Sequence, residues 1–168
     1  MLLLAATLAF AHHGEEAAAA PKPNPAFEAI KALAGTWKGT AQHGGDPMPA
    51  EVTYRVSGSG TSVIETLFPG SDHEMVTVYY PDGDVGVMLT HFCASGNQPR
   101  MKLDPKSPAG TMHFAYVDAT NLKKGDYHMH EGTVTVVDGA HLKESWLGYA
   151  GGKPAGAAEF TLERVVTP

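Results

Sequence analysis

The stretch Leu33-Ala34-Gly35-Thr36-Trp37-Lys38-Gly39 separates two different patterns in the sequence. Before it, Asn24-Pro25 offers an N-cap followed by a proline at the first helical position, and apolar residues recur at helical spacing until Gly35. After it, apolar and polar residues alternate in short runs rich in Val, Thr, Tyr and Phe, separated by Gly, Pro and Asp. The sequence therefore predicts one short amphipathic helix followed by a series of β-strands.

Ten strands are expected after this transition. Their approximate ranges are 36–43, 49–57, 60–68, 73–80, 84–93, 98–104, 110–118, 126–137, 141–149 and 156–166. Short antiparallel strands in hairpin order leave two open edges unless the sheet closes on itself. We therefore predict an all-β fold, a single ten-stranded antiparallel up-and-down barrel with the short N-terminal helix plugging one end. A β-sandwich is the alternative architecture.

Composition narrows the class of protein. The chain has 168 residues, of which 43% are hydrophobic and 18% charged, which is typical of one globular domain. Its 12 Lys and Arg against 18 Asp and Glu give a net charge of −6, so binding to nucleic acid or to anionic lipid is disfavoured. The one cysteine, Cys93, cannot form an intramolecular disulfide.

The first residues carry a pattern typical of export. Residues 1–11 read MLLLAATLAFA. This apolar run ends in a small-x-small motif and is shorter than the roughly 20 apolar residues that span a bilayer. We predict a signal peptide and Ala-rich leader over residues 1–20, a linker over 21–25 and the barrel domain over 26–168. The mature protein is then expected to be periplasmic or secreted, without stable membrane insertion.

Gly35, Trp37 and Arg164 together resemble the signature of the calycins, a Gly-x-Trp opening combined with an arginine in the last strand. The resemblance implies that Arg164 packs over Trp37 at the closed end of the barrel. An indole can fill the base of a barrel, and a guanidinium group can stack on its face while it caps nearby carbonyl groups.

A narrower resemblance, over about residues 26–166, is to an uncharacterised family of exported bacterial calycin-like proteins. It rests on the segments 73–80, 89–93 and 96–101, and on Asp118, Asn121, His128-Met129-His130 and Trp146. This family implies a fold but no activity. A remoter similarity is to nitrobindin-type barrels of ten strands, which implies haem as a cofactor held by one histidine of a late strand. It does not indicate which histidine of this chain would serve.

Two histidines suggest a metal site. His128 and His130 are two residues apart, so on a strand they share a face at about 6.5–7 Å from one another. Because Gly132 and Val134 continue that face, we expect both imidazoles to point into the barrel. With one histidine and one carboxylate from other strands they form a candidate set for zinc or copper: His91, His128, His130 and Glu65.

Carboxylates on other apolar faces suggest a ligand site. Alternation places Glu65, His91 and Glu144 inside the barrel, where such groups are costly unless they pair or bind something. A polar network without a ligand is the alternative. Arg100, in the connection between two strands, can orient a carboxylate or phosphate ligand or brace the loop to Asp104. The candidate ligand-binding residues are therefore Glu65, His91, Arg100 and Glu144.

These observations predict an exported β-barrel that binds a small molecule in its cavity, with an internal His/Glu cluster that holds a metal or a metal-containing ligand. One alternative is a metal-dependent enzyme of hydrolase type, in which the same cluster activates water. A second is a structural or interaction module with no internal site. The sequence indicates neither the ligand nor the oligomeric state.

Overall fold

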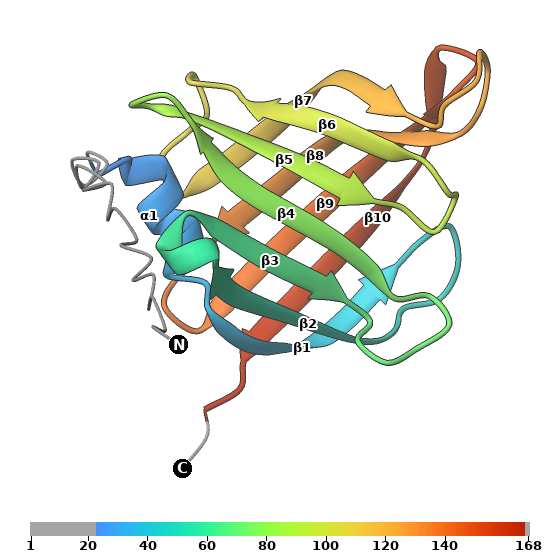
Figure 1. Cartoon of the computed structure of the whole chain (residues 1–168). Coiled ribbons are helices and arrows are strands. Elements are labelled where there is room, and N and C mark those ends of the chain that lie inside the picture. Colours follow the sequence, from blue (N-terminus) through green and yellow to red (C-terminus); the bar gives the residue numbers. More distant parts are fainter. Residues whose placement is uncertain (1–22, 167–168) are drawn as a thin grey trace, which may run out of the picture.

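The computed structural model describes residues 23–166, which form a closed barrel of ten strands with one short helix at one end (Figure 1). The elements are α1 (Pro25–Lys31), β1 (Gly35–Gln42), β2 (Met48–Ser57), a 3-10 turn (Gly58–Gly60), β3 (Ser62–Leu67), β4 (Met75–Asp82), β5 (Gly86–Phe92), β6 (Gln98–Leu103), β7 (Thr111–Thr120), β8 (His128–Val136), β9 (His141–Ala150) and β10 (Lys153–Arg164). Each of the ten strands overlaps the strand predicted for it. The predicted signal peptide and leader lie outside the described residues.

Each strand pairs antiparallel with the next one along the chain, and β10 pairs with β1 to close the sheet. The predicted up-and-down barrel is therefore confirmed, and the β-sandwich is wrong. Within residues 23–166, closure pairs both edges of the sheet, which removes the sites where another strand would add. No helix of this part of the chain is long and apolar enough to cross a membrane.

The helix α1 covers one end of the barrel (Figure 1). Asn24 caps it, because the side-chain oxygen accepts a hydrogen bond from the Phe27 backbone N–H at 3.1 Å. The amide nitrogen of Asn24 donates to the carbonyl oxygen of Gly86 at 2.9 Å, which ties the start of the helix to β5. Phe27 and Ile30 are buried against the barrel. This end is the closed end of the barrel.

Trp37 and Arg164 meet at the closed end, as the calycin resemblance implied. The two residues are direct partners in the β1–β10 pairing, and the guanidinium carbon lies 4.2 Å from the centre of the indole ring. The indole N–H donates to the Leu33 carbonyl oxygen at 2.8 Å. The guanidinium group donates to three further carbonyl oxygens, those of Ala32, Ala34 and Gly139. One arginine thus joins the helix, the first strand and the β8–β9 turn.

Candidate functional site

A cavity of about 620 Å³ lies at the other end of the barrel, between the strand ends that are farthest from α1. Its walls are mainly apolar and aromatic, among them Leu67, Phe68, Met75, Met129, Trp146 and Phe160. Its polar lining includes His91, Cys93 and the rim histidines His43 and His73. None of the described residues that line it is Asp, Glu, Lys or Arg, so the wall carries no permanent charge.

His91 of β5 is a polar residue in the lining of this cavity. Its side chain is 2% exposed, and its ring stacks on Trp146 with 4.8 Å between ring centres. Nδ1 lies 2.9 Å from the Thr77 hydroxyl oxygen, whereas Nε2 is buried with no hydrogen-bond partner among the described residues. Burial lowers the pKa of His91 to about 4, so the imidazole is neutral at physiological pH. The cavity therefore borders a neutral imidazole with one unsatisfied nitrogen.

Beneath His91, a row of polar side chains crosses four neighbouring strands. Tyr54 of β2 is the cross-strand partner of Glu65, Glu65 is the partner of Thr77, and Thr77 is the partner of His91. Directly opposed residues lie close enough for their side chains to interact. All four side chains are buried, and the cavity lining includes His91 but not the other three. We call Tyr54, Glu65, Thr77 and His91 the polar row.

Glu144 of β9 faces the polar row from the opposite wall of the barrel. The Tyr54 hydroxyl oxygen lies 2.8 Å from Glu65 Oε1 and 2.6 Å from Glu144 Oε1. A phenol has one hydrogen, so these two contacts need a further proton on one of the carboxyl groups. The Tyr79 hydroxyl donates to Glu65 at 3.0 Å and the Trp146 indole N–H approaches Glu144 at 3.3 Å. The two acids therefore share one hydrogen-bonded cluster.

We assign the proton of this cluster to Glu144. Burial, and then the charge of Glu65, raise the pKa of Glu144 well above its usual value. Burial also raises the pKa of Glu65, but hydrogen bonds from Glu144, Thr77 and the two tyrosines work against that change by stabilising the charged form. Glu65 is therefore the carboxylate and Glu144 the neutral acid, which limits the buried charge to one unit.

The structure brings together three of the four predicted ligand-binding residues. Glu65, His91 and Glu144 lie inside the barrel, as their alternation predicted, but His91 alone of the three lines the cavity. Arg100 does not join them, because it is exposed on β6 and donates two hydrogen bonds to Asp118 of β7. The predicted alternative partner, Asp104, is wrong as well. Whether the internal residues bind a ligand stays a prediction.

The expected inward orientation of His128 and His130 is wrong. A β-bulge between Met129 and Glu131 adds one residue to β8 and shifts the alternation. Met129 is 8% exposed and lines the cavity, while His130 stacks between the rings of Tyr116 and Tyr149, at 4.7 and 3.9 Å. The two histidines contact each other through His128 Nε2 and His130 Nδ1, 3.1 Å apart, and they are absent from the lining of the cavity.

The predicted metal set is consequently not assembled. His128 and His130 face outward, away from His91 and Glu65 inside the barrel. Within residues 23–166, no three His, Cys, Asp or Glu side chains are arranged to hold a metal ion.

The late-strand histidine that the nitrobindin resemblance implied does not fit haem binding in this cavity. The histidines of β8 face outward, and His141 of β9 is exposed at the closed end, where it contacts Asp138. His91, which lines the cavity, belongs to β5 and not to a late strand. The described residues therefore do not reproduce a late-strand axial ligand.

Three members of the internal site were not among the sequence candidates. Tyr54, Thr77 and Tyr79 complete the hydrogen-bonded cluster. The signal for Tyr54 was its alternation with the inward-facing Ala50 and Val52. The contacts of Tyr54, Thr77 and Tyr79 with Glu65 depend on strand register, which a single sequence does not show.

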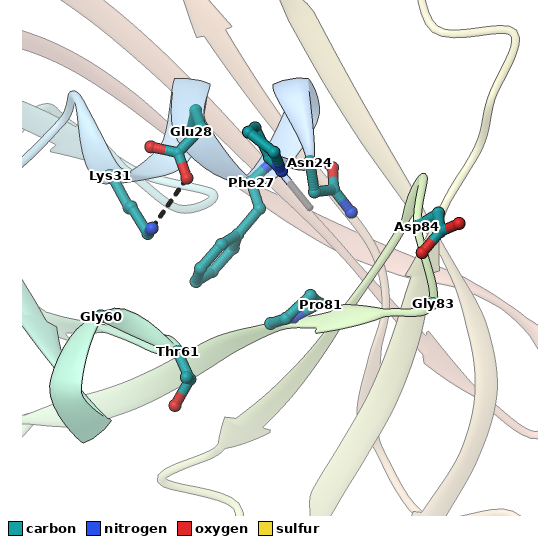
Figure 2. A pocket seen from close by; sticks show the side chains of 10 residues that line it. Asn24, Phe27, Glu28, Lys31, Gly60, Thr61, Pro81, Gly83 and Asp84 are labelled. Atoms are coloured by element: carbon teal, nitrogen blue, oxygen red, sulfur yellow. Dashed lines mark hydrogen bonds and ion pairs between the residues drawn. The ribbon is translucent and has the colours of Figure 1, made fainter. Parts of the chain in front are cut away.

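A second hollow, of about 670 Å³, lies at the closed end between α1 and the turns that follow β2 and β4. Figure 2 shows Phe27 directed from the helix towards Thr61 and Pro81, beside the ion pair of Glu28 and Lys31 at 2.7 Å. None of the predicted site residues lines this hollow. The cavity at the open end is therefore the candidate functional site.

The fold and this cavity define the class of protein: a closed ten-stranded barrel with an apolar pocket at one end. No protein-family model and no curated protein matches the sequence. Rv2717c from M. tuberculosis aligns with a TM-score of 0.57 and 16% identity, over 84% of this chain and 98% of that chain. A protein of unknown function from the DUF3598 family of Nostoc punctiforme aligns with a TM-score of 0.55 and 12% identity, over 87% of this chain and 51% of its own.

These two structures show the fold and no more. The present chain spans about half the length of the Nostoc punctiforme protein. Together with the ten-stranded barrel, both structures fit a calycin-like fold, which agrees with the broadest of the three sequence resemblances.

Proposed function

We propose that the protein binds a small, neutral and largely apolar molecule in the cavity at the open end. The observation that carries the proposal is an apolar cavity lined by His91, a residue whose buried Nε2 has no hydrogen-bond partner among the described residues. Ligand sites are typically concave and mainly apolar, with a few polar groups that set the orientation of the ligand. The cavity has this composition.

Size and charge both support a neutral small molecule. A volume of about 620 Å³ lies within the range of roughly 300–1,000 Å³ that is typical of small-molecule sites. The described lining residues include no Lys or Arg that would pair with an anion and no Asp or Glu that would pair with a cation. Transfer of an unpaired charge into such a cavity would be costly.

Binding can be tested with the untagged full chain and N-phenyl-1-naphthylamine, a neutral probe whose fluorescence rises in apolar surroundings. We expect saturable binding in the wild-type protein. Ala158→Trp, which fills part of the cavity, should weaken it at least tenfold. Ala115→Trp is the matched control, because Ala115 is exposed on β7 and does not line the cavity.

Two results would count against the proposal. One is the absence of saturable binding in the wild-type protein, and the other is unchanged affinity in Ala158→Trp. Circular dichroism checks that both variants keep the fold. An absorption spectrum and elemental analysis of protein from its native compartment test the haem and metal predictions at the same time.

Export belongs to the same proposal and rests on residues 1–20 of the sequence. Cell fractionation followed by amino-terminal sequencing of the full-length product tests it. A mature protein that begins just after Ala11, or within or just after the alanine-rich segment 17–20, would support export. An uncleaved protein in the cytoplasm would contradict it.

A further inference from the structure

We propose that the molecule bound in the cavity carries a neutral hydroxyl group, of the alcohol or phenol class, which donates a hydrogen bond to Nε2 of His91. This inference rests on the proposed function and adds the chemistry of the ligand's polar end. It follows from which nitrogen of His91 carries the hydrogen.

The polar row sets the position of that hydrogen. Thr77 lies between Glu65 and His91 in the cross-strand pairing, and its hydroxyl contacts both side chains. A hydroxyl has one hydrogen to donate, and an ionised carboxylate can only accept. Because Glu65 is the carboxylate of the acid pair, Thr77 donates to Glu65. The Thr77 oxygen then accepts the hydrogen of His91 Nδ1.

A neutral imidazole with its hydrogen on Nδ1 has a lone pair on Nε2. Nε2 is buried and unpartnered among the described residues, and His91 lines the cavity, whereas Thr77 and Glu65 do not. The side of His91 that faces Thr77 is therefore satisfied. The remaining polar atom is an acceptor that only a ligand, or a water in its place, can satisfy.

Other polar groups on a ligand fit this acceptor less well. A carboxylate has no hydrogen to donate, so it would be repelled by the Nε2 lone pair and by the charge of Glu65 two strands away. The described cavity lining holds no cation that would offset this repulsion. A purely apolar ligand would leave Nε2 buried and unpaired, which costs free energy. A hydroxyl group satisfies Nε2 and introduces no charge.

The remaining walls fit the rest of such a molecule. The hydroxyl end would lie against His91 and Trp146, and an alkyl or aromatic body would contact Phe68, Met75 and Phe160. The structure thus assigns a polar inner end and an apolar outer part to the ligand.

The test compares three compounds of one shape: 4-hexylphenol, 4-hexylanisole and 4-hexylbenzoate. The affinity of each compound is measured by its competition with N-phenyl-1-naphthylamine for the full chain. A neutral hydrogen bond contributes about 0.5–1.5 kcal/mol, so the phenol should bind up to about tenfold more tightly than its methyl ether. The benzoate should bind more weakly than the phenol.

Variants assign the preference to His91. His91→Phe keeps an aromatic ring but removes the acceptor, and should bind the phenol and the anisole equally. His141→Phe makes the same substitution at the closed end, outside the lining of this cavity, and should retain the preference. Thr77→Val leaves His91 in place but removes the contact that orients its hydrogen, and should reduce the preference. It also serves as a second variant if His91→Phe does not fold.

The outcomes separate the inference from the proposed function. If neither the naphthylamine probe nor any of the three compounds binds saturably to the wild-type protein, the proposed function fails. If all of them bind but the wild-type protein does not prefer the phenol, binding stands and the inference is overturned. Retention of the preference in folded His91→Phe, or tightest binding of the benzoate, also overturns it.

Discussion

Acidification should destabilise the protein through His91. Burial holds its pKa at about 4 in the folded state, against 6.5 for an ordinary histidine. Between these two values the unfolded chain binds a proton that the folded protein does not bind, so the free energy of unfolding rises with pH across this window. The stabilisation is fully present above pH 6.5 and is lost as the pH falls towards 4.

The expected magnitude follows from the same two pKa values. A pKa lowered from 6.5 to about 4 corresponds to a loss of about 3 kcal/mol of the free energy of unfolding on acidification. The raised pKa of Glu144 acts in the opposite direction, because the folded protein keeps that proton at a pH where the unfolded chain releases it. The wild-type profile alone therefore does not isolate His91.

A comparison with His91→Phe removes this difficulty, since both proteins retain Glu144. Urea unfolding can be followed by the fluorescence of the buried Trp37 and Trp146 at a series of pH values. The wild-type protein should lose about 3 kcal/mol more than the variant between pH 6.5 and 4. His73→Gln, which removes a rim histidine and leaves His91 in place, should keep the wild-type profile. Parallel profiles for wild type and His91→Phe would refute the argument.

Four further substitutions test the packing around the site by urea unfolding at neutral pH. Trp37→Ala should cost about 3–5 kcal/mol, because it leaves a cavity where the indole is fully buried; a near-neutral change would contradict the closed-end packing. Glu144→Gln should be tolerated better than Glu65→Gln by about 1–3 kcal/mol, because the amide replaces a neutral acid in one case and a carboxylate with several donors in the other. Equal costs would remove our assignment of the proton, and a larger cost for Glu144→Gln would reverse it. Gly132→Ala should cost about 1–3 kcal/mol and weaken probe binding, because a Cβ atom there would lie 2.9 Å from the Trp146 ring beside the cavity; unchanged stability and affinity would show that the ring moves freely.

Much of the fold could be predicted from local patterns in the sequence. The transition at residues 33–39 separated the helix from the strands, and turn residues marked the ends of the ten strands within about three positions. The pairing of Trp37 with Arg164 followed once the last strand was placed beside the first. These features depend on short stretches of sequence or on one closure rule, which is why sequence reasoning could reach them.

The candidate site was predicted only in part, because it depends on register and on one irregularity. Alternation placed Glu65 and His91 inside, but it could not show that Thr77 lies between them across three strands. The bulge at residues 129–131 reversed the expected faces of His130 and Met129. An inserted residue cannot be detected from the alternation of apolar residues when small and polar residues follow it. The insertion nevertheless changes which side chains reach the cavity.

The polar row is better explained by the cavity than by stability. Two acids buried in a barrel cost free energy, and apolar side chains of similar volume often serve folding equally well or better. The closed end shows that this chain can build an efficient core, since Trp37 and Arg164 satisfy their polar atoms on backbone carbonyls. The row, in contrast, ends at His91, which lines the cavity and whose Nε2 the described residues leave unpaired. Its carboxylate orients Thr77 and Thr77 orients His91, so the buried charge maintains a lone pair at the place where a ligand would bind.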